Sequence, residues 1–513
     1  MVDQTSRDPL FRSNFAELLR RAGALYGGRT AMALRDRNVT FADLCARAAG
    51  IAATLTEAGV RPGDCCAVLV REPEFAVAAF FAALAVGAVG INVNELYRPR
   101  QVEFVLGHSG ATALLVSDDV LESQPRRIDS GARIISVDDI APSTSPFEVV
   151  PREPSDPAQV TYTSGSTGQP KGVLMGHENL WAGVRIVADY LGLTQHDRIA
   201  SLLPFSFVYG FNQLTTALYT GAALVVDRST LALEIVANLK REQVTVLAAV
   251  PPLWQRLLEV PSFRDEQLPH LRIMTNAGGR LAPATVVELR RVQPQAKLFL
   301  MYGLTEVFRS TYLPPEEVDA HPDSMGRAIP ESAVYVVGDD GQLARPGEVG
   351  QLVHGGPTVG IGYLGDAEAT ARVFRPNAFL QPGETEPARV VYSGDLVRRD
   401  EEGRLYYVAR SDRMIKTLGF RVSPDEIADV IQASGQVSEV AVISEPDTQR
   451  GDRIVACVVL RTGGSLDALK KFCAVELPRY MQPARYAPVS AIPRNPSGKH
   501  DLFALKQEVV GQK

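Results

Sequence analysis

The sequence has little cysteine, no excess of basic charge and no hydrophobic run that is typical of a membrane span. Its 513 residues include five cysteines, an odd number whose spacing fits neither a disulfide framework nor a zinc site. The net charge of −6 gives no reason to expect a nucleic-acid backbone or an anionic membrane as a partner. The N-terminus also lacks the basic and then apolar pattern of a secretory signal. We therefore expect a cytoplasmic protein with reduced thiols.

The most apolar stretch, residues 75–93, consists mainly of Ala, Val and Gly and is interrupted by Asn92. A membrane-spanning helix needs about 20 predominantly apolar residues of higher hydrophobicity. A buried helix over Glu74–Val86, a turn at Gly87 and Gly90, and a following buried strand explain this composition better. The sequence therefore predicts no membrane span.

Short apolar runs alternate with amphipathic stretches up to about residue 400, which predicts layered α/β sheets with helices on both faces. The predicted strands are Cys65–Val70, Ala113–Val116, Ile134–Val137, Ile199–Leu203, Ala223–Val226, Val244–Ala248, Arg272–Thr275 and Leu298–Met301. The predicted helices are Asn14–Ala24, Phe41–Ala58, Glu74–Val86, Leu180–Leu191, Ala232–Arg241, Leu253–Leu258 and Pro283–Val292. Between Asp319 and Tyr407, strands such as Val334–Val337 and Gly350–His354 alternate with Gly/Pro turns and predict a β-rich subdomain.

A second change of pattern falls near Arg410 to Asp412, and the residues beyond it predict a small α+β domain with its own core. Its predicted elements are the helix Pro424–Ala433, the strands Glu439–Ser444 and Ile454–Leu460, the helix Asp467–Glu476 and the strand Arg485–Ala491. We therefore predict a large N-terminal domain over residues 1–411, with the β-rich subdomain at about 319–407. The small C-terminal domain is predicted over residues 412–513.

The run from Tyr162 to Gly172 has the composition of an anion-binding loop. Small residues let backbone N–H groups converge on an anion, and hydroxyl groups and Lys171 add donors and a positive charge. The apolar residues Ala158–Thr161 predict a strand that holds this loop. It is not the common P-loop, because Gly172 rather than Ser or Thr follows the lysine, and a flexible linker would not explain the Pro-Lys-Gly ending. The candidate polyphosphate contacts are Thr163, Ser164, Gly165, Ser166, Thr167, Gly168 and Lys171.

Other candidate binding groups follow predicted strands or lie on a loop that is rich in Gly and Pro. Tyr302 can offer a flat face to a purine, and Glu306 is the kind of oxygen ligand that Mg²⁺ prefers. Asp395 follows the apolar strand Arg389 to Tyr392, where a carboxylate can accept hydrogen bonds from ribose hydroxyls. Lys499 lies on a Gly/Pro loop from which its amine can reach a distant site.

Five segments in order along the chain carry a resemblance to a known family. They are Tyr162–Gly172, Tyr302–Glu306, Tyr392–Asp395, Arg410–Arg421 and Pro496–Lys499. Together they resemble the adenylate-forming superfamily, which includes acyl-CoA synthetases, luciferases and peptide-synthetase adenylation domains. The sequence has Ser393 where most members have Thr, and Ala409 where Gly is usual.

The resemblance implies ATP, Mg²⁺ and coenzyme A as ligands and assigns a role to each matching residue. The implied catalytic residues are Lys499 for adenylation, Thr305 near the α-phosphate, Glu306 on the metal, Asp412 as the domain hinge and Gly419 in the pantetheine tunnel. The implied nucleotide contacts beyond the phosphate loop are Gly278, Tyr302, Asp395, Arg410, Lys416 and Arg421. After adenylation, the small domain is expected to rotate about Asp412.

The acid pocket is expected around Pro204–Gly210 and Asn276–Arg280. Many related synthetases have His where this chain has Phe207, and this change favours a hydrophobic acid, with no group evident that would bind a cation. The candidate pocket residues are Phe207, Val208, Tyr209, Gly210, Asn276, Ala277 and Gly279. Core packing is an equally good explanation for Phe205 and Phe211.

The leading hypothesis is an AMP-forming acyl-CoA synthetase, an acid–thiol ligase for a hydrophobic carboxylic acid. The alternative within the superfamily is a stand-alone adenylating enzyme that passes acyl-AMP to an acyl carrier protein or a separate acyltransferase. A non-catalytic nucleotide sensor is disfavoured because Lys499, Glu306 and Asp395 are all present. Nothing in the sequence indicates luciferase-type oxidation.

Overall fold

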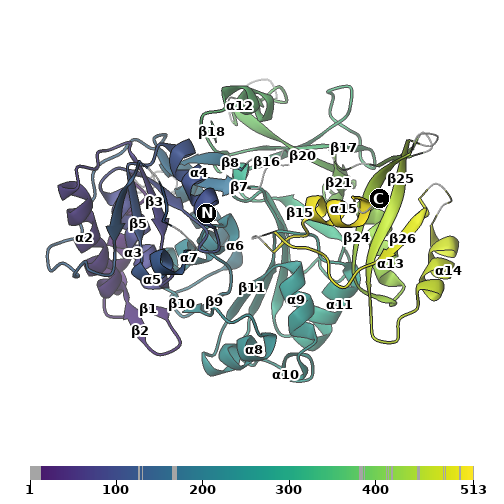
Figure 1. Cartoon of the computed structure of the whole chain (residues 1–513), viewed down its shortest axis with the longest axis horizontal. Helices are drawn as coiled ribbons and strands as arrows, with labels where there is room; N and C mark the ends of the chain where they lie inside the picture. Colours follow the sequence, from purple (N-terminus) through teal and green to yellow (C-terminus); the bar gives the residue numbers. More distant parts are fainter. Residues whose placement is uncertain are drawn as a thin grey trace.

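The computed structural model describes residues 13–511, except 125–126, 130, 164–169, 381–384, 386, 412, 414, 418–419, 448–450, 478, 480 and 496–497. For residues 416, 420–421, 446–447 and 451 it describes the backbone only. The described strands form three sheets of 14, 7 and 5 strands (Figure 1).

One half of the 14-stranded sheet is parallel, and only its outermost strand is antiparallel to its neighbour. Its strands are, in spatial order, β13 (Lys297–Tyr302), β12 (Ile273–Asn276), β11 (Val246–Ala249), β9 (Arg198–Ser201), β10 (Ala223–Val226), β1 (Thr30–Ala33) and β2 (Asn38–Thr40). The strands predicted from apolar runs in this region are confirmed. They could be predicted because each is short and mostly buried, and a strand that is buried on both faces appears in the sequence as a continuous apolar run.

The other half of this sheet is antiparallel and joins the parallel half at the β13–β14 pairing. Its strands are β14 (Thr311–Leu313), β15 (Ser324–Ala328), β21 (Leu405–Arg410), β20 (Arg389–Arg399), β17 (Val349–Gly355) and β16 (Ala333–Val337), with β19 (Phe374–Pro376) on β20. The strand-rich character expected for this stretch is therefore observed, although its strands continue the large sheet through hydrogen bonds.

The seven-stranded sheet supplies a second layer. Its order is β18 (Gly362–Tyr363), β8 (Lys171–Gly176), β7 (Pro157–Thr163), β4 (Val89–Asn92), β3 (Cys65–Leu69), β5 (Ala113–Val116) and β6 (Arg133–Ser136). The strands β3 to β6 are parallel, as the alternation with helices predicts.

Helices lie between the two large sheets and on their outer faces, which confirms the predicted layered α/β architecture. The largest buried cluster contains apolar residues of both sheets and of the helices between them: α1 (Glu17–Tyr26), α2 (Phe41–Glu57), α3 (Pro73–Ala85), α6 (His177–Leu191) and α7 (Val208–Thr220). A second cluster packs three helices on the 14-stranded sheet: α8 (Ala232–Arg241), α9 (Pro251–Leu258) and α11 (Pro283–Val292), next to the short α10 (Pro261–Arg264). A third packs α4 (Pro99–Ser109) and α5 (Asp118–Ser123) on the seven-stranded sheet.

The apolar stretch at residues 75–93 forms α3, a turn at Gly87 with a φ of +83°, and β4. Every α3 residue except Phe75 is buried, and this explains a composition that is apolar on all sides of the helix. No helix in the described part of the chain is long and apolar enough to cross a membrane.

The C-terminal residues form a separate group of elements around the five-stranded sheet, drawn in yellow-green in Figure 1. Its strands are β22 (Ile415–Thr417), β23 (Phe420–Val422), β24 (Val437–Asp447), β25 (Gly451–Leu460) and β26 (Arg485–Pro488). The helices α13 (Pro424–Ala433) and α14 (Leu466–Glu476) pack on one face, and α15 (Leu502–Val510) packs on the other. The predicted small α+β unit with its own core is thus observed.

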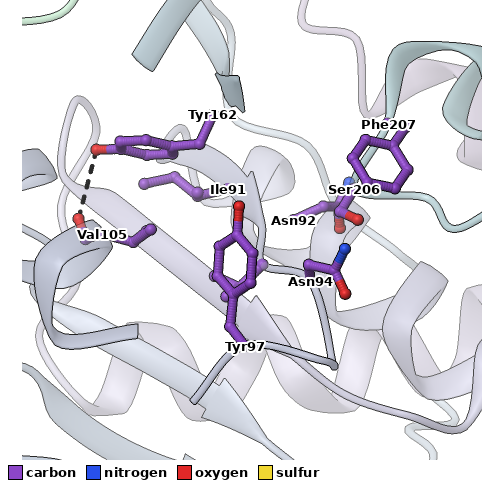
Figure 2. Close-up of a pocket in the computed structure, with 9 residues that line it drawn as sticks. Ile91, Asn92, Asn94, Tyr97, Val105, Tyr162, Ser206 and Phe207 are labelled. Carbon is purple, nitrogen blue, oxygen red and sulfur yellow. Dashed lines mark hydrogen bonds between the residues drawn. The ribbon is translucent and has the colours of Figure 1, made fainter. Parts of the chain in front are cut away.

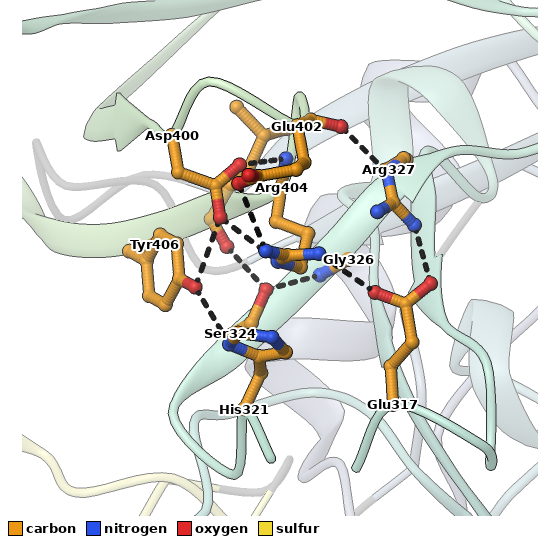
Figure 3. A network of polar contacts seen from close by, with 10 residues as sticks. Glu317, His321, Ser324, Gly326, Arg327, Asp400, Glu402, Arg404 and Tyr406 are labelled. Atoms are coloured by element: carbon orange, nitrogen blue, oxygen red, sulfur yellow. Dashed lines mark hydrogen bonds and ion pairs between the residues drawn. The ribbon is translucent and has the colours of Figure 1, made fainter. Parts of the chain in front are cut away.

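A network of polar contacts supports the junction of β15 and β21 (Figure 3). Glu317 binds Arg327 at 2.6 Å and Arg404 at 3.2 Å, and Arg404 binds Asp400 at 2.8 Å. The Tyr406 hydroxyl donates to Asp400 at 3.2 Å. The network stabilises the turn between β20 and β21. Arg410 is the last residue of β21, so this turn also helps to position Arg410 at the candidate site.

One prediction about strand ends is wrong. We expected Asp395 to follow a strand that ends at Tyr392, but β20 continues to Arg399 and Asp395 lies within it. Gly394 has a φ of +75°, and the pairing with β17 shifts register between Gln351 and Val353. This bulge next to Ser393–Asp395 re-aims the side chains, so a carboxylate is presented from inside a strand.

Candidate active site

The predicted phosphate loop connects the antiparallel strands β7 and β8, and Thr163 pairs with Lys171 across its base. The predicted contacts Ser164, Gly165, Ser166, Thr167 and Gly168 lie outside the described residues. The Lys171 amine lies 5.0 Å from the centroid of the Tyr363 ring. The base of the loop thus places the positively charged side chain of Lys171 next to β18.

Glu306 lies in the short 3₁₀ helix Thr305–Val307 that follows β13. Its carboxylate accepts a hydrogen bond of 2.6 Å from the Tyr363 hydroxyl. Burial raises the pKa of Tyr363, and the neighbouring Glu306 raises it further, so this tyrosine remains a donor at neutral pH. Tyr363 therefore links Glu306 to Lys171, a connection that sequence reasoning missed because Tyr363 lies far along the chain from both.

The described residues contain no group of three or more His, Cys, Asp or Glu side chains that could hold a metal ion. Mg²⁺ is usually bound through one or two carboxylates together with phosphate oxygens and water. A single oriented carboxylate at Glu306, close to a predicted phosphate loop, fits that mode of binding.

Tyr302, Asp395 and Arg410 meet at the bulge in β20. The Tyr302 hydroxyl donates a short hydrogen bond to Asp395, and Arg410 Nη1 lies 3.4 Å from the other Asp395 oxygen. The Tyr302 ring stacks on His354 at 5.8 Å, so one ring face is covered by protein. Burial of His354 lowers its pKa to about 3 and keeps this imidazole neutral. Ala409, which stands where Gly is usual in the superfamily, is fully buried in β21 without a positive φ, so this backbone position does not require glycine.

Lys499 reaches this cluster from the C-terminal unit. Burial lowers the pKa of its amine, while the charges of Asp395 and Glu306 oppose this shift and those of Arg413 and Arg410 add to it. Lys499 as a whole residue is exposed to solvent. The charges of Glu306, Asp395 and Arg410 nevertheless all act on its amine.

Polar contacts to β24 hold the Lys499 loop. Arg494 forms an ion pair with Glu439 and donates to the Gly498 carbonyl at 2.8 Å. The Lys499 N–H donates to the Asn495 side chain at 3.0 Å. Burial and the nearby Arg494 lower the pKa of His500 to about 4. These contacts give the described part of the loop a defined backbone position next to β24.

A salt bridge joins the two units in this orientation. Arg280, which follows β12 and the Asn276–Gly279 turn, pairs with Asp429 on α13. The partner of Arg280 lies 149 residues away along the chain, so the sequence alone could not predict this salt bridge. The predicted hinge Asp412 and tunnel residue Gly419 lie outside the described residues, as do the side chains of Lys416 and Arg421.

A small pocket lies between the start of the phosphate loop and the segment before α7 (Figure 2). The Tyr97 ring projects into it from below, Tyr162 closes its upper side, and Phe207 and Ser206 border its other end. Its lining residues are Ile91, Asn92, Val93, Asn94, Tyr97, Val105, Tyr162, Ser206 and Phe207. The lining contains no carboxylate that could balance a cation. Asn92, Asn94 and Tyr97 carry no local motif, so the sequence did not identify them.

The predicted acid-binding segments pack against each other. Tyr209 in the first turn of α7 donates to the Thr275 carbonyl at 2.8 Å, and its hydroxyl lies 2.6 Å from Thr275 Oγ1. A Cβ at Gly210 would collide with the backbone oxygens of Pro204 and Leu203, so glycine is required for this approach. Gly278 has a φ of +80°, and Asn276 Nδ2 donates to the Gly279 carbonyl at 3.0 Å across the tight turn. Val208 begins α7, and Ala277 is buried.

Comparison with known proteins places these features in context. A family model for AMP-binding enzymes matches residues 19–364, and a model for the AMP-binding enzyme C-terminal domain matches residues 426–499. The chain is 30% identical to tyrocidine synthase 2 of Brevibacillus parabrevis over 93% of its own length and 13% of that protein. It is 29% identical to indoleacetate–CoA ligase of Aromatoleum aromaticum, over 96% of this chain and 98% of that protein.

Some solved structures are similar to this one over nearly the whole chain. The o-succinylbenzoate CoA synthetase MenE of Bacillus subtilis, bound to its acyl-adenylate intermediate, is 27% identical with a TM-score of 0.83, over 95% of this chain and 97% of that chain. The same enzyme has been solved with ATP and a magnesium ion. The chain thus spans a small part of the peptide synthetases that it matches and nearly all of these CoA ligases.

Proposed function

Because the chain belongs to the AMP-binding enzyme family and is an adenylate-forming enzyme, we propose that it converts a hydrophobic carboxylic acid to its CoA thioester. In the first step, a carboxylate oxygen attacks the α-phosphorus of ATP, and pyrophosphate leaves. In the second step, the thiol of coenzyme A attacks the acyl carbon, and AMP leaves. The observation that carries this proposal is that the charges of Asp395 and Glu306 act on the Lys499 amine, which the C-terminal unit contributes.

The residues of this chain would act by position and charge. Asp395 would accept hydrogen bonds from the ribose hydroxyls, with Arg410 and Tyr302 orienting its two oxygens. Thr163, Lys171 and the loop between them would hold the phosphates, with Thr305 near the α-phosphate. Lys499 would neutralise charge between the incoming carboxylate and the α-phosphate, which is the main requirement of such a transfer. Mg²⁺, held by Glu306, would neutralise phosphate charge and orient the leaving pyrophosphate.

A hydrophobic acid is supported by the apolar segment Phe205–Tyr209 and by the small pocket beside it, whose lining has no carboxylate. An α-amino acid carries an ammonium group that would need such a partner when buried. Relatives named for indoleacetate and o-succinylbenzoate act on aromatic carboxylic acids, which supports the same class here.

A second candidate is an adenylating enzyme that passes its acyl group to a carrier protein or a separate acyltransferase. The match to tyrocidine synthase 2, a much longer protein, favours this possibility. The choice of acceptor decides between the two candidates, because both share the adenylation step. The rotation about Asp412 that would bring Gly419 to the site belongs to the proposal in either case.

Pyrophosphate release from ATP, measured with a panel of aliphatic and aryl acids, tests the first step. Coenzyme A is then added and the product is analysed by mass for the thioester. Acid-dependent pyrophosphate release with thioester supports the CoA ligase. Release without thioester favours the carrier-dependent enzyme, and no release with any acid contradicts both.

A further inference from the structure

Arg309 is a buried cation that the proposed reaction does not use. It is 3% exposed, and its Nε and Nη2 atoms have no hydrogen-bond partner among the described residues. Its backbone lies directly against Gly303, where an added Cβ would be 3.1 Å from Arg309 Cα. The arginine therefore lies beneath the strand exit that carries Tyr302 and Glu306.

The surroundings of the Arg309 guanidinium are aromatic. Its central carbon lies 5.1 Å from the centroid of the Tyr209 ring, and its charge also acts on Tyr190. The Tyr209 hydroxyl already bonds to Thr275, while Tyr190 stacks on Tyr312 at 4.3 Å. A ring face stabilises a cation only partly, so these contacts leave the hydrogens on Nε and Nη2 without acceptors among the described residues.

Arg185 provides the comparison, since it and Arg309 are the two arginines that are buried in the described part of the chain. Arg185 makes two hydrogen bonds of 2.6 Å to the Glu331 carboxylate. No carboxylate of a described residue forms an ion pair with Arg309. An uncompensated buried charge is strongly unfavourable, so the contrast indicates an acceptor that the described residues do not supply.

Water in the neighbouring space does not resolve this deficit. Arg309 borders a small cavity with Ser310, Ser332 and His354, which has no room for a water molecule. Each of these three neighbours also has a buried polar atom without a partner. The other neighbour of the guanidinium is the Tyr209 ring, where the candidate acid-binding segments meet, and this is the side from which we expect an acceptor to enter.

We propose that Arg309 binds a second carboxylate at the far end of the acid substrate, and that the natural substrate is a dicarboxylic acid with an apolar body. This rests on the proposed function and on the expected location of the acid pocket around Pro204–Gly210 and Asn276–Arg280. Arg309 would then be a specificity residue: its charge is compensated only when the correct acid is bound. A monocarboxylic acid of equal length would leave the guanidinium unpaired and would be rejected.

The test compares acids that differ only in the second carboxylate: hexanoate with adipate, octanoate with suberate, and benzoate with terephthalate. For each, kcat/KM for pyrophosphate release is measured with the wild type, Arg309→Met, Arg309→Lys and the control Arg185→Met. The wild type should favour the dicarboxylate of at least one pair by about 30-fold or more, because losing one partner of a buried charge pair costs at least about that factor. Arg309→Met should abolish this preference, Arg309→Lys should restore part of it, and Arg185→Met should retain it.

Equal rates within all three pairs, or a preference that survives in Arg309→Met, would overturn the inference while the adenylation function stands. An equal loss for both acids of a pair would also overturn it, since Arg309 would then act on the reacting carboxylate or on the fold. Thermal stabilisation by the same dicarboxylates without ATP gives a separate measurement. If no acid releases pyrophosphate, the proposed function fails, but thermal stability still tests the inference. A dicarboxylate that stabilises the wild type and not Arg309→Met supports binding at Arg309. If no dicarboxylate stabilises the wild type more than Arg309→Met, the inference is overturned.

Discussion

Replacing Arg280 should weaken adenylation selectively, because its salt bridge with Asp429 joins the large unit to the small unit in the orientation in which the Asp395 charge acts on Lys499. The two side chains are 30% and 37% exposed, so the pair is partly shielded from solvent. Exposed pairs contribute at most about 1 kcal/mol, and partial burial places this pair near that upper value. Arg280→Ala should therefore reduce the population of this orientation about fivefold.

The assay separates the two steps. Pyrophosphate release from acid and ATP should fall about fivefold in Arg280→Ala, while thioester formation from supplied acyl-AMP and coenzyme A should not fall. The reversed pair Arg280→Asp with Asp429→Arg should recover most of the loss, whereas Arg280→Asp alone should be the weakest variant because two carboxylates then face each other. Burial raises the pKa of Asp429 although Arg280 opposes this shift, so lowering the pH should weaken the pair earlier than for an exposed aspartate.

Equal losses in both steps would refute the reasoning, since Arg280 would then act through the fold or through ligand binding. A loss that the reversed pair leaves unchanged would refute it as well, because charge complementarity across the units is the stated cause.

Three further predictions concern the same molecule. Lys499→Ala should reduce pyrophosphate release by at least about 100-fold yet spare thioester formation from acyl-AMP, and an equal loss of both steps would contradict the role of Lys499 in adenylation. Because burial lowers the pKa of the lysine amine, adenylation by the wild type should decline at a lower pH than the pKa of an ordinary lysine would give. Tyr363→Phe removes the 2.6 Å hydrogen bond to Glu306 and should raise the Mg²⁺ concentration for half-maximal rate by about 10-fold, with an unchanged requirement counting against the assigned metal site. His177 accepts a hydrogen bond from the Phe15 N–H, and burial lowers the pKa of the imidazole to about 4. The contribution of neutral His177 to stability should therefore be complete above about pH 6.5 and lost as the pH falls towards 4. His177→Asn should flatten the pH dependence of the urea midpoint between pH 6.5 and 5, and a slope identical to that of the wild type would refute this.

Hydrophobic periodicity made much of the α/β layering predictable. Strands such as β5 and β10 are short apolar runs between polar turns, and α8 and α11 have a clear apolar face. The helix α7 was not predicted, because its sequence is apolar or weakly polar on all sides and nine of its residues are buried. The full length of β20 was also missed, since Ser393 and Gly394 resemble a turn and only the tertiary pairing shows a bulge.

The parts of the candidate site that depend on local motifs could be located from the sequence. Tyr302 ends a strand, Glu306 lies just after it, and Lys499 lies on a Gly/Pro loop, so these positions could be predicted. Asp395 could be identified by its motif but not by its place within β20, and the roles of all four residues remain predictions. Tyr363, Arg309, Glu439 and Asp429 could not be identified in this way. Their importance comes from partners that are distant in sequence, and no local pattern marks an arginine that lacks an acceptor.

The three sheets contribute unequally to the site, and this difference has a mechanistic consequence. The two large sheets share the core packed by α3, α6 and α7, so the groups from β7, β13 and β20 have fixed relative positions. The C-terminal sheet has separate cores of its own, and it meets the rest at the site through polar groups such as Asp429 and Lys499. Polar contacts between units exchange more readily than a packed interior does. The proposed two-step reaction requires the Lys499 amine to be present for the first step and absent for the second. The position of Lys499 on the C-terminal unit, and of the proposed nucleotide contacts Tyr302 and Asp395 on the large sheet, is consistent with that requirement.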